Sequence, residues 1–217
     1  MMHRGFPQWL ALVLLTSACG SNAPTIPKEL LGSSSSCSAP DYPKEGIGTE
    51  LGDVVQNACF SGYRSPKAVP PSPEHLETIA FSDYYDPAGT KGNVELLLVN
   101  TAAVWCAACV AEHETLPDHY EQFAPQGLVI LSTLFQDAQR NPATLADLAR
   151  WIANFNTNFP MVADPELRMG VYASPDTAPL NLVIDAHTMR ILRKYLGNQA
   201  AVIWPYIESE LARRSSR

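Results

Sequence analysis

The sequence is short of basic residues, of charge in general and of long apolar runs. Its 217 residues hold 15 Lys and Arg against 22 Asp and Glu, a formal net charge of -7. Nucleic-acid binding needs a basic face that neutralises phosphates, which this composition does not favour. No stretch approaches the roughly 20 apolar residues that cross a bilayer, so a polytopic membrane protein is excluded. Hydrophobic residues make up 46% of the chain and charged residues 17%, which favours a folded core over disorder.

The start of the chain has the parts of a secretory signal. A weakly positive pair, residues 3–4, precedes an apolar run over residues 9–15, and small residues 16–18 lead into Cys19. This apolar run is too short for a transmembrane helix and matches the core of a signal peptide. We therefore expect residues 1–18 to be a signal peptide.

Cys19 is the first of only five cysteines. A cysteine directly after small residues resembles the lipobox of bacterial lipoproteins, in which cleavage leaves that cysteine as the lipid-modified first residue. The family usually has Leu three places before the cysteine, where this chain has Thr16. The resemblance implies a lipid anchor on Cys19, and secretion with a free Cys19 is the alternative. Either case predicts an extracytoplasmic compartment that permits disulfides.

The next segment, residues 19–48, is predicted to be a flexible tether. It holds four prolines, the serine run 33–36 and few large apolar side chains. Cys37 lies near its end, and Cys59 follows 22 residues later in a strand-like stretch. The simplest interpretation in an oxidising compartment is a Cys37–Cys59 disulfide that pins the tether to the domain. Two free thiols or an intermolecular bond are the alternatives.

Strand patterns alternate with helix patterns in the rest of the chain. We expect an N-terminal extension or hairpin over residues 49–75 and a folded domain over residues 76–217. Short apolar runs predict strands at residues 94–100, 128–135, 159–163, 180–185 and 190–196. The alternation favours an α/β fold, and an antiparallel last pair of strands makes its sheet mixed.

Apolar residues at helical spacing predict three helices. The first covers residues 106–124, with a kink at Pro117. The second covers residues 142–155, capped by Asn141 with Pro142 at its first position. The last runs between residues 199 and 214.

The reactive groups concentrate in Trp105-Cys106-Ala107-Ala108-Cys109. Two cysteines three apart at a helix start can close a disulfide with little rearrangement. The unpaired N–H groups there favour a thiolate, so we expect the pKa of Cys106 below the free value of about 8.5. Thiolate is the form that attacks disulfides. No second CxxC motif accompanies this one, so neither zinc nor another metal is expected.

A strand, then Trp-Cys-x-x-Cys opening a helix, then Pro179 leading into an apolar strand, resembles the thioredoxin fold. More narrowly it resembles the TlpA/ResA-like, membrane-tethered thiol-disulfide oxidoreductases of bacteria, over about Leu76 to Ala212. The resemblance implies a three-layer α/β fold with a central mixed sheet flanked by helices. It implies that Cys106 is the nucleophile and Cys109 the resolving thiol, with no cofactor besides their disulfide.

The same resemblance implies roles for neighbouring residues. Pro179 would be a cis-proline that, with Ala178, presents its backbone to an extended substrate, and Trp105 would flank the exposed sulfur. Glu112, three places after Cys109, would accept its proton. Its alternative is a solvated carboxylate on the helix.

Asn100 departs from the pattern of cytosolic thioredoxins, which have a proton-accepting Asp six places before the first cysteine. The residues between the cysteines, Ala107 and Ala108, supply neither charge nor a rigid ring, so the direction of electron flow stays open. By resemblance the partners are exported cysteine proteins such as apocytochrome c, with a membrane electron donor for a reductase.

Two other functions are weighed against this one. A peroxiredoxin-like thiol peroxidase shares the fold, but its signature needs Pro at position 99 and Thr at position 103, where this chain has Val99 and Ala103. A non-catalytic binding module would keep Cys106–Cys109 as a static disulfide. His113 is expected to be packed in the core and His119 to lie at the surface.

Overall fold

The computed structural model describes residue 1, residues 37–173 and residues 176–216. The expected signal peptide, Cys19 and most of the tether therefore lie outside the described residues. Within them, no helix combines the length and the apolar character needed to cross a membrane.

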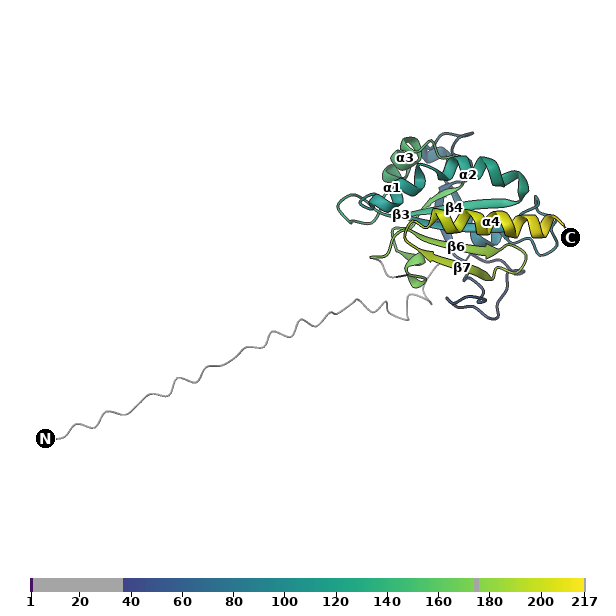
Figure 1. The fold of residues 1–217 in the computed structure, drawn as a ribbon. Helices are drawn as coiled ribbons and strands as arrows, with labels where there is room; N and C mark the ends of the chain where they lie inside the picture. The colour runs from purple at the N-terminus through teal and green to yellow at the C-terminus, as the bar shows by residue number, and fades with distance from the viewer. Residues whose placement is uncertain (2–36, 174–175, 217) are drawn as a thin grey trace.

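A mixed sheet forms the centre of the domain (Figure 1). Its seven strands lie in the order β2-β1-β5-β4-β3-β6-β7. Strands β3, β4 and β5 are parallel to one another, while β1, β2, β6 and β7 pair antiparallel with their neighbours. Their bounds are β1 Cys59–Tyr63, β2 Glu77–Ala80, β3 Leu96–Ala103, β4 Leu128–Gln136, β5 Met161–Ala163, β6 Leu180–Asp185 and β7 Ile191–Leu196. The predicted α/β class with a mixed sheet is confirmed.

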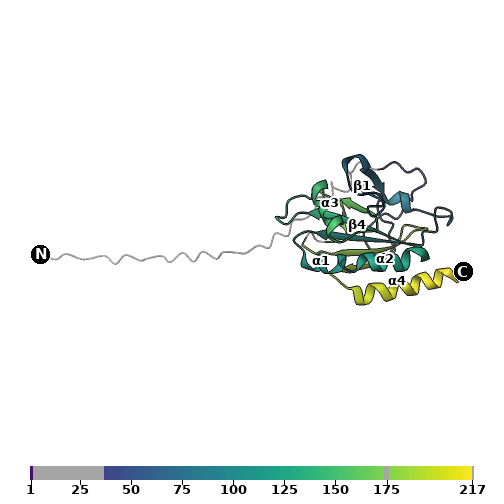
Figure 2. The ribbon, with the colours of Figure 1, turned by 90° about the horizontal axis from the view of Figure 1, so that it is seen from above.

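The two faces of the sheet are covered differently. All four α-helices contribute to one hydrophobic cluster on one face, and Figure 2 shows α1, α2 and α4 along that side. The other cluster is closed by residues 42–55 and by short 3-10 turns. The helices are α1 Ala107–His113, α2 Leu116–Phe123, α3 Leu145–Asn154 and α4 Ala200–Ser215; the turns are η2 Pro73–His75, η3 Phe81–Tyr84, η4 Ala124–Gln126 and η5 Arg168–Val171.

The first predicted helix is broken rather than kinked. It ends at His113 and restarts at Leu116, with Pro117 in the first turn of α2. Proline has no N–H to bond to the carbonyl four residues earlier, and its ring clashes there, which favours a break at this point. Thr115 closes the first piece, because both its N–H and its hydroxyl donate to the carbonyl of Glu112.

The predicted start of α3 is wrong by one turn. Thr144, not Asn141, is the cap: its hydroxyl accepts from the N–H of Asp147, whose carboxylate accepts from the N–H of Thr144 in return. This capping box satisfies two free amides. Asn141 instead donates its N–H to Asp137, and Pro142 pairs with Gln136.

The segment before β1 is tied to the domain edge by a covalent bond and hydrogen bonds. Cys37 and Cys59 form a disulfide. The side-chain amide of Asn57 donates to the carbonyl of Cys37, and the hydroxyl of Tyr42 donates to the carbonyl of Val55. Strand β1 itself pairs with both β2 and β5, so the chain from Cys59 onward completes the sheet.

Replacing both Cys37 and Cys59 with serine is expected to lower the free energy of unfolding by about 3 kcal/mol. A disulfide restrains the unfolded chain, and a loop of 22 residues is worth about that much in the chain-entropy account. Urea unfolding of the oxidised proteins measures the change. Disulfide exchange by the untouched Cys106–Cys109 pair is the control, and an unchanged unfolding midpoint would contradict a stabilising role.

Candidate active site

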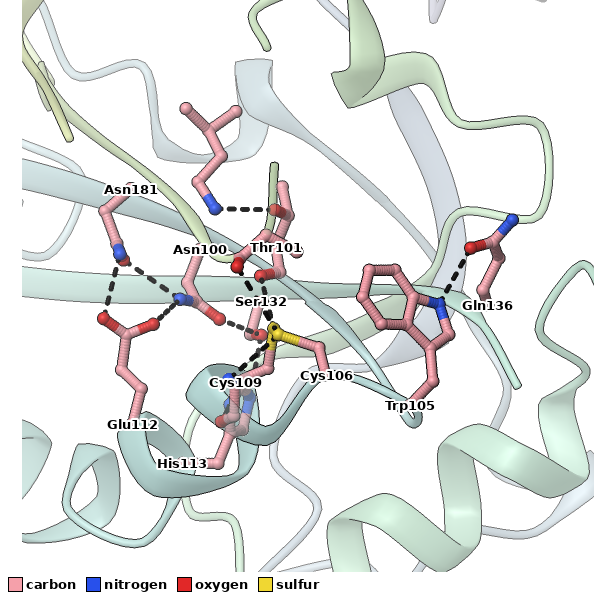
Figure 3. The surroundings of a disulfide bond; sticks show 12 residues. Asn100, Thr101, Trp105, Cys106, Cys109, Glu112, His113, Ser132, Gln136 and Asn181 are labelled. Carbon is pink, nitrogen blue, oxygen red and sulfur yellow. Dashed lines mark hydrogen bonds between the residues drawn. A yellow bond between two sulfur atoms is a disulfide. The ribbon is translucent and has the colours of Figure 1, made fainter. Parts of the chain in front are cut away.

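The Cys106–Cys109 pair sits where a buried strand meets a helix (Figure 3). Every residue of β3 is buried, and three residues beyond its end Cys106 caps α1. The two sulfurs form a disulfide, and the N–H of Cys109 donates to Cys106 Sγ at 3.1 Å. Cys106 is 4% exposed and Cys109 0%, so an incoming partner reaches Cys106 first.

A second loop approaches the disulfide from the start of β6. The Ala178–Pro179 peptide bond is cis, as the resemblance implied. The carbonyl oxygen of Ala178 lies 3.5 Å from Cys106 Sγ. Thr101 of β3 fixes this loop, because its hydroxyl accepts from the N–H of Leu180 at 3.0 Å. The antiparallel pairing of β3 with β6 thus brings residues distant in sequence to one sulfur.

Trp105 is held beside the cysteines by residues at the end of β4. Its ring N–H donates to Gln136 Oε1 at 2.9 Å, and the Phe135 ring meets it edge-on. The Arg140 guanidinium carbon lies 3.9 Å from the centre of the indole ring, within range of a cation–π interaction. Sequence reasoning missed Gln136 and Arg140, because no spacing signals that the loop after β4 folds back over Trp105.

Glu112 is buried, so the solvated alternative is wrong. It is 3% exposed, and both carboxylate oxygens accept amide donors: Asn100 Nδ2 at 2.7 Å and Asn181 Nδ2 at 2.9 Å. Burial raises the pKa of Glu112 to about 7, against the lowering effect of these two hydrogen bonds. A carboxyl group near neutrality can take up or release a proton at working pH.

Three histidines, His113, His119 and His187, have different surroundings. His113 is fully buried, as predicted, and burial lowers its pKa to about 4. His119 is not a free surface residue, because it is partly buried and stacks on Trp204 at 3.9 Å. His187 lies in the turn after β6, with Nε2 3.0 Å from Glu95. Over residues 37–173 and 176–216, no three His, Cys, Asp or Glu side chains gather as a metal site would need.

Comparison with known proteins points to one class. No family model matches the chain. It is 33% identical over 112 residues to the thiol:disulfide interchange protein DsbE of Pseudomonas fluorescens biotype C, covering 49% of this chain and 54% of that one. It is 35% identical over 124 residues to the protein of the same name from Vibrio cholerae serotype O1, covering 55% of this chain and 59% of that one. The chain thus matches little more than half the length of these curated relatives.

Solved structures share the fold at low identity. A putative thiol:disulfide interchange protein DsbE from Chlorobium tepidum superposes with a TM-score of 0.56 at 14% identity, covering 76% of this chain and 98% of that one. A thiol:disulfide interchange protein from Bacteroides sp. superposes with a TM-score of 0.53 at 15% identity, covering 75% of this chain and 91% of that one. The likeness establishes the architecture around the disulfide.

Proposed function

We propose that this chain, a member of the thioredoxin-fold superfamily, is a thiol-disulfide oxidoreductase of the cell envelope that acts on exported proteins. The observation that carries the proposal is the Cys106–Cys109 disulfide at the start of α1, with the carbonyl of a cis-prolyl loop 3.5 Å from Cys106 Sγ. A static structural disulfide needs no such neighbour.

The first chemical step uses Cys106. In the reduced enzyme its thiolate attacks one sulfur of a partner disulfide, forming a mixed disulfide and releasing the other partner sulfur as a thiolate, which takes a proton from water. The N–H of Cys109, which points at Cys106 Sγ, stabilises the attacking anion. The carbonyl oxygen of Ala178 lies beside the same sulfur, where it can accept a hydrogen bond from a backbone N–H of an extended partner segment.

The second step uses Cys109 and Glu112. Cys109 is shut off from solvent, so its proton needs an internal acceptor. Glu112 lies one helical turn further along α1 and accepts it. The Cys109 thiolate then attacks Cys106, which closes the internal disulfide and releases the second partner sulfur. The partner gains two electrons and the enzyme loses two.

The residues between the cysteines favour the reductase direction. Glu112 as a base speeds the last step forward and backward alike, so it does not select a direction. Two alanines between the cysteines add no cation that would stabilise the Cys106 thiolate and so make the pair a strong oxidant. The enzyme would then need a membrane electron donor to reduce it again.

The proposed location follows from the leader and Cys19, which lie outside the described residues. A lipid on Cys19 would hold the domain at a membrane, facing the periplasm. Its partners would be proteins of that compartment whose cysteines have paired.

The reduction potential of the Cys106–Cys109 pair tests the proposal. We expect a value near that of thioredoxin, about -270 mV, measured by thiol trapping in dithiothreitol or glutathione buffers. A value near -120 mV would contradict the reductase direction, because it marks an oxidant. Failure to exchange in any buffer would contradict the function itself.

A further inference from the structure

A buried chain of hydrogen bonds connects the helix of the cysteines to Glu112 by way of the sheet (Figure 3). His113 Nδ1 lies 3.1 Å from the carbonyl oxygen of Cys109, and its Nε2 lies 3.1 Å from Ser132 Oγ. Ser132 Oγ is also 2.8 Å from Asn100 Oδ1. The amide of Asn100 then donates to Glu112 Oε2 at 2.7 Å. The side chains along this path do not contact solvent, since His113, Ser132 and Asn100 are all 0% exposed.

This series of hydrogen bonds has one donor hydrogen too few for its acceptors. A carbonyl oxygen only accepts, so His113 Nδ1 carries the hydrogen in its contact with Cys109. In a neutral imidazole Nε2 is then an acceptor, and burial keeps His113 neutral by lowering its pKa to about 4. A serine hydroxyl has a single hydrogen. Both His113 Nε2 and Asn100 Oδ1 need the one on Ser132.

The position of that hydrogen affects Glu112. Hydrogen bonds in a chain polarise one another, so an amide whose oxygen accepts is a stronger donor through its nitrogen. When Ser132 donates to Asn100, the amide stabilises the Glu112 carboxylate more. When Ser132 donates to His113, the Asn100 amide stabilises the Glu112 carboxylate less.

We propose that His113 is a positioning residue for proton transfer at Cys109: by competing with Asn100 for the Ser132 hydrogen, it sets how readily Glu112 holds a proton. The inference rests on the proposed function for its consequence in catalysis. Its physical content, the coupling of His113 to Glu112 through Ser132, does not depend on that function.

Few other groups packed around Glu112 and His113 could shift the pKa of Glu112. Glu112 meets the amides of Asn100 on β3 and Asn181 on β6; the titratable groups beside it on its own helix are His113 and, once reduced, Cys109. The His113 ring lies among aromatic rings, those of Trp151, Phe155 and Phe159. The described residues that set the pKa values of Glu112 and His113 include no charged side chain.

Two substitutions should move the pKa of Glu112 in opposite directions. Ser132→Ala removes the donor to Asn100, so the pKa rises. His113→Phe removes the competing acceptor and leaves the Ser132 hydrogen to Asn100, so the pKa falls; a phenyl ring suits the aromatic surroundings. Each shift should be about 0.1 to 0.6, because one hydrogen bond strengthens the next by roughly 10–30% of a bond to a charged group. The pKa is read from the pH dependence of the Glu112 carboxyl carbon by NMR in the oxidised protein, where no thiol titrates beside it.

Thr133 provides a matched control. It follows Ser132 on β4, is buried, and its hydroxyl has no hydrogen-bond partner among the described residues. Thr133→Val should leave the pKa of Glu112 unchanged. Shifts of the same sign in Ser132→Ala and His113→Phe, or none, would overturn the inference; His113→Leu carries the same expectation if the Phe variant does not fold. Loss of disulfide exchange in the unmodified protein would instead contradict only the proposed function.

Discussion

Replacing Cys106 with serine is expected to lower the rate of disulfide exchange by on the order of 10⁴-fold or more, while the fold is kept. The reason is chemical, because a serine hydroxyl does not ionise at working pH and cannot attack a disulfide as a thiolate does. Serine is close to cysteine in size and can still accept the N–H of Cys109, so the start of α1 is retained. The rate of insulin reduction in the presence of dithiothreitol, above the background without enzyme, measures the loss.

Cys109→Ser separates the two cysteines by role. In this variant we expect Cys106 to attack still, but nothing resolves the product, so a mixed disulfide with glutathione should accumulate and appear as a mass increase. The exposure of the two residues, 4% for Cys106 against 0% for Cys109, favours this order. Exchange retained by Cys106→Ser, or a mixed disulfide trapped by Cys106→Ser and not by Cys109→Ser, would reverse the assignment.

Local patterns in the sequence were enough to predict strands β3 to β7, but not β2. Buried parallel strands are short apolar runs, and such runs at residues 128–135 and 180–185 became β4 and β6 almost to the residue. The CxxC motif at a strand-to-helix junction likewise identified two cysteines that form a disulfide. These features depend on neighbours in the chain, and so a sequence displays them.

The surroundings of the cysteines could be predicted only in part. Glu112 has a helical position relative to Cys109, but its burial depends on Asn181, 69 residues away. The cis bond before Pro179 came from the family resemblance, since only about 5 to 6% of X-Pro bonds in folded proteins are cis. Ser132 gave no signal at all, because a serine inside an apolar strand does not reveal which strand or helix it will face.

Replacing Glu112 with glutamine is expected to slow closure of the internal disulfide by about 10²- to 10⁴-fold, the range typical of a lost general base. In the unmodified protein this step should speed up as the pH rises through about 7, because Glu112 accepts a proton only when ionised. The variant should lack that rise. Stopped-flow measurement of the reduced enzyme with a protein disulfide gives the profile. Glu114→Gln, which changes the exposed carboxylate at the C-cap of the same helix, is the control. An unchanged pH midpoint in Glu112→Gln would contradict the assignment.

The same substitution should change how stability depends on pH. The pKa of Glu112 is 4.5 in its ordinary state and about 7 in the fold, so between these values the unfolded chain has released a proton that the folded chain keeps. The free energy of unfolding of the unmodified protein therefore carries a contribution that is full below about pH 4.5 and is lost as the pH rises through about 7, on the order of 3 kcal/mol.

Glutamine has no such contribution, so the stability of Glu112→Gln relative to the unmodified protein should increase across that window. The absolute values also include Asp164, whose pKa burial raises to about 6, and His113, whose pKa burial lowers to about 4. Both groups are present in the two proteins, so the difference between their urea unfolding free energies at pH 5, 6, 7 and 8 isolates Glu112. Two parallel curves would mean that the carboxyl titrates alike in the folded and unfolded chains, and Glu112 could not then serve as a base tuned by burial.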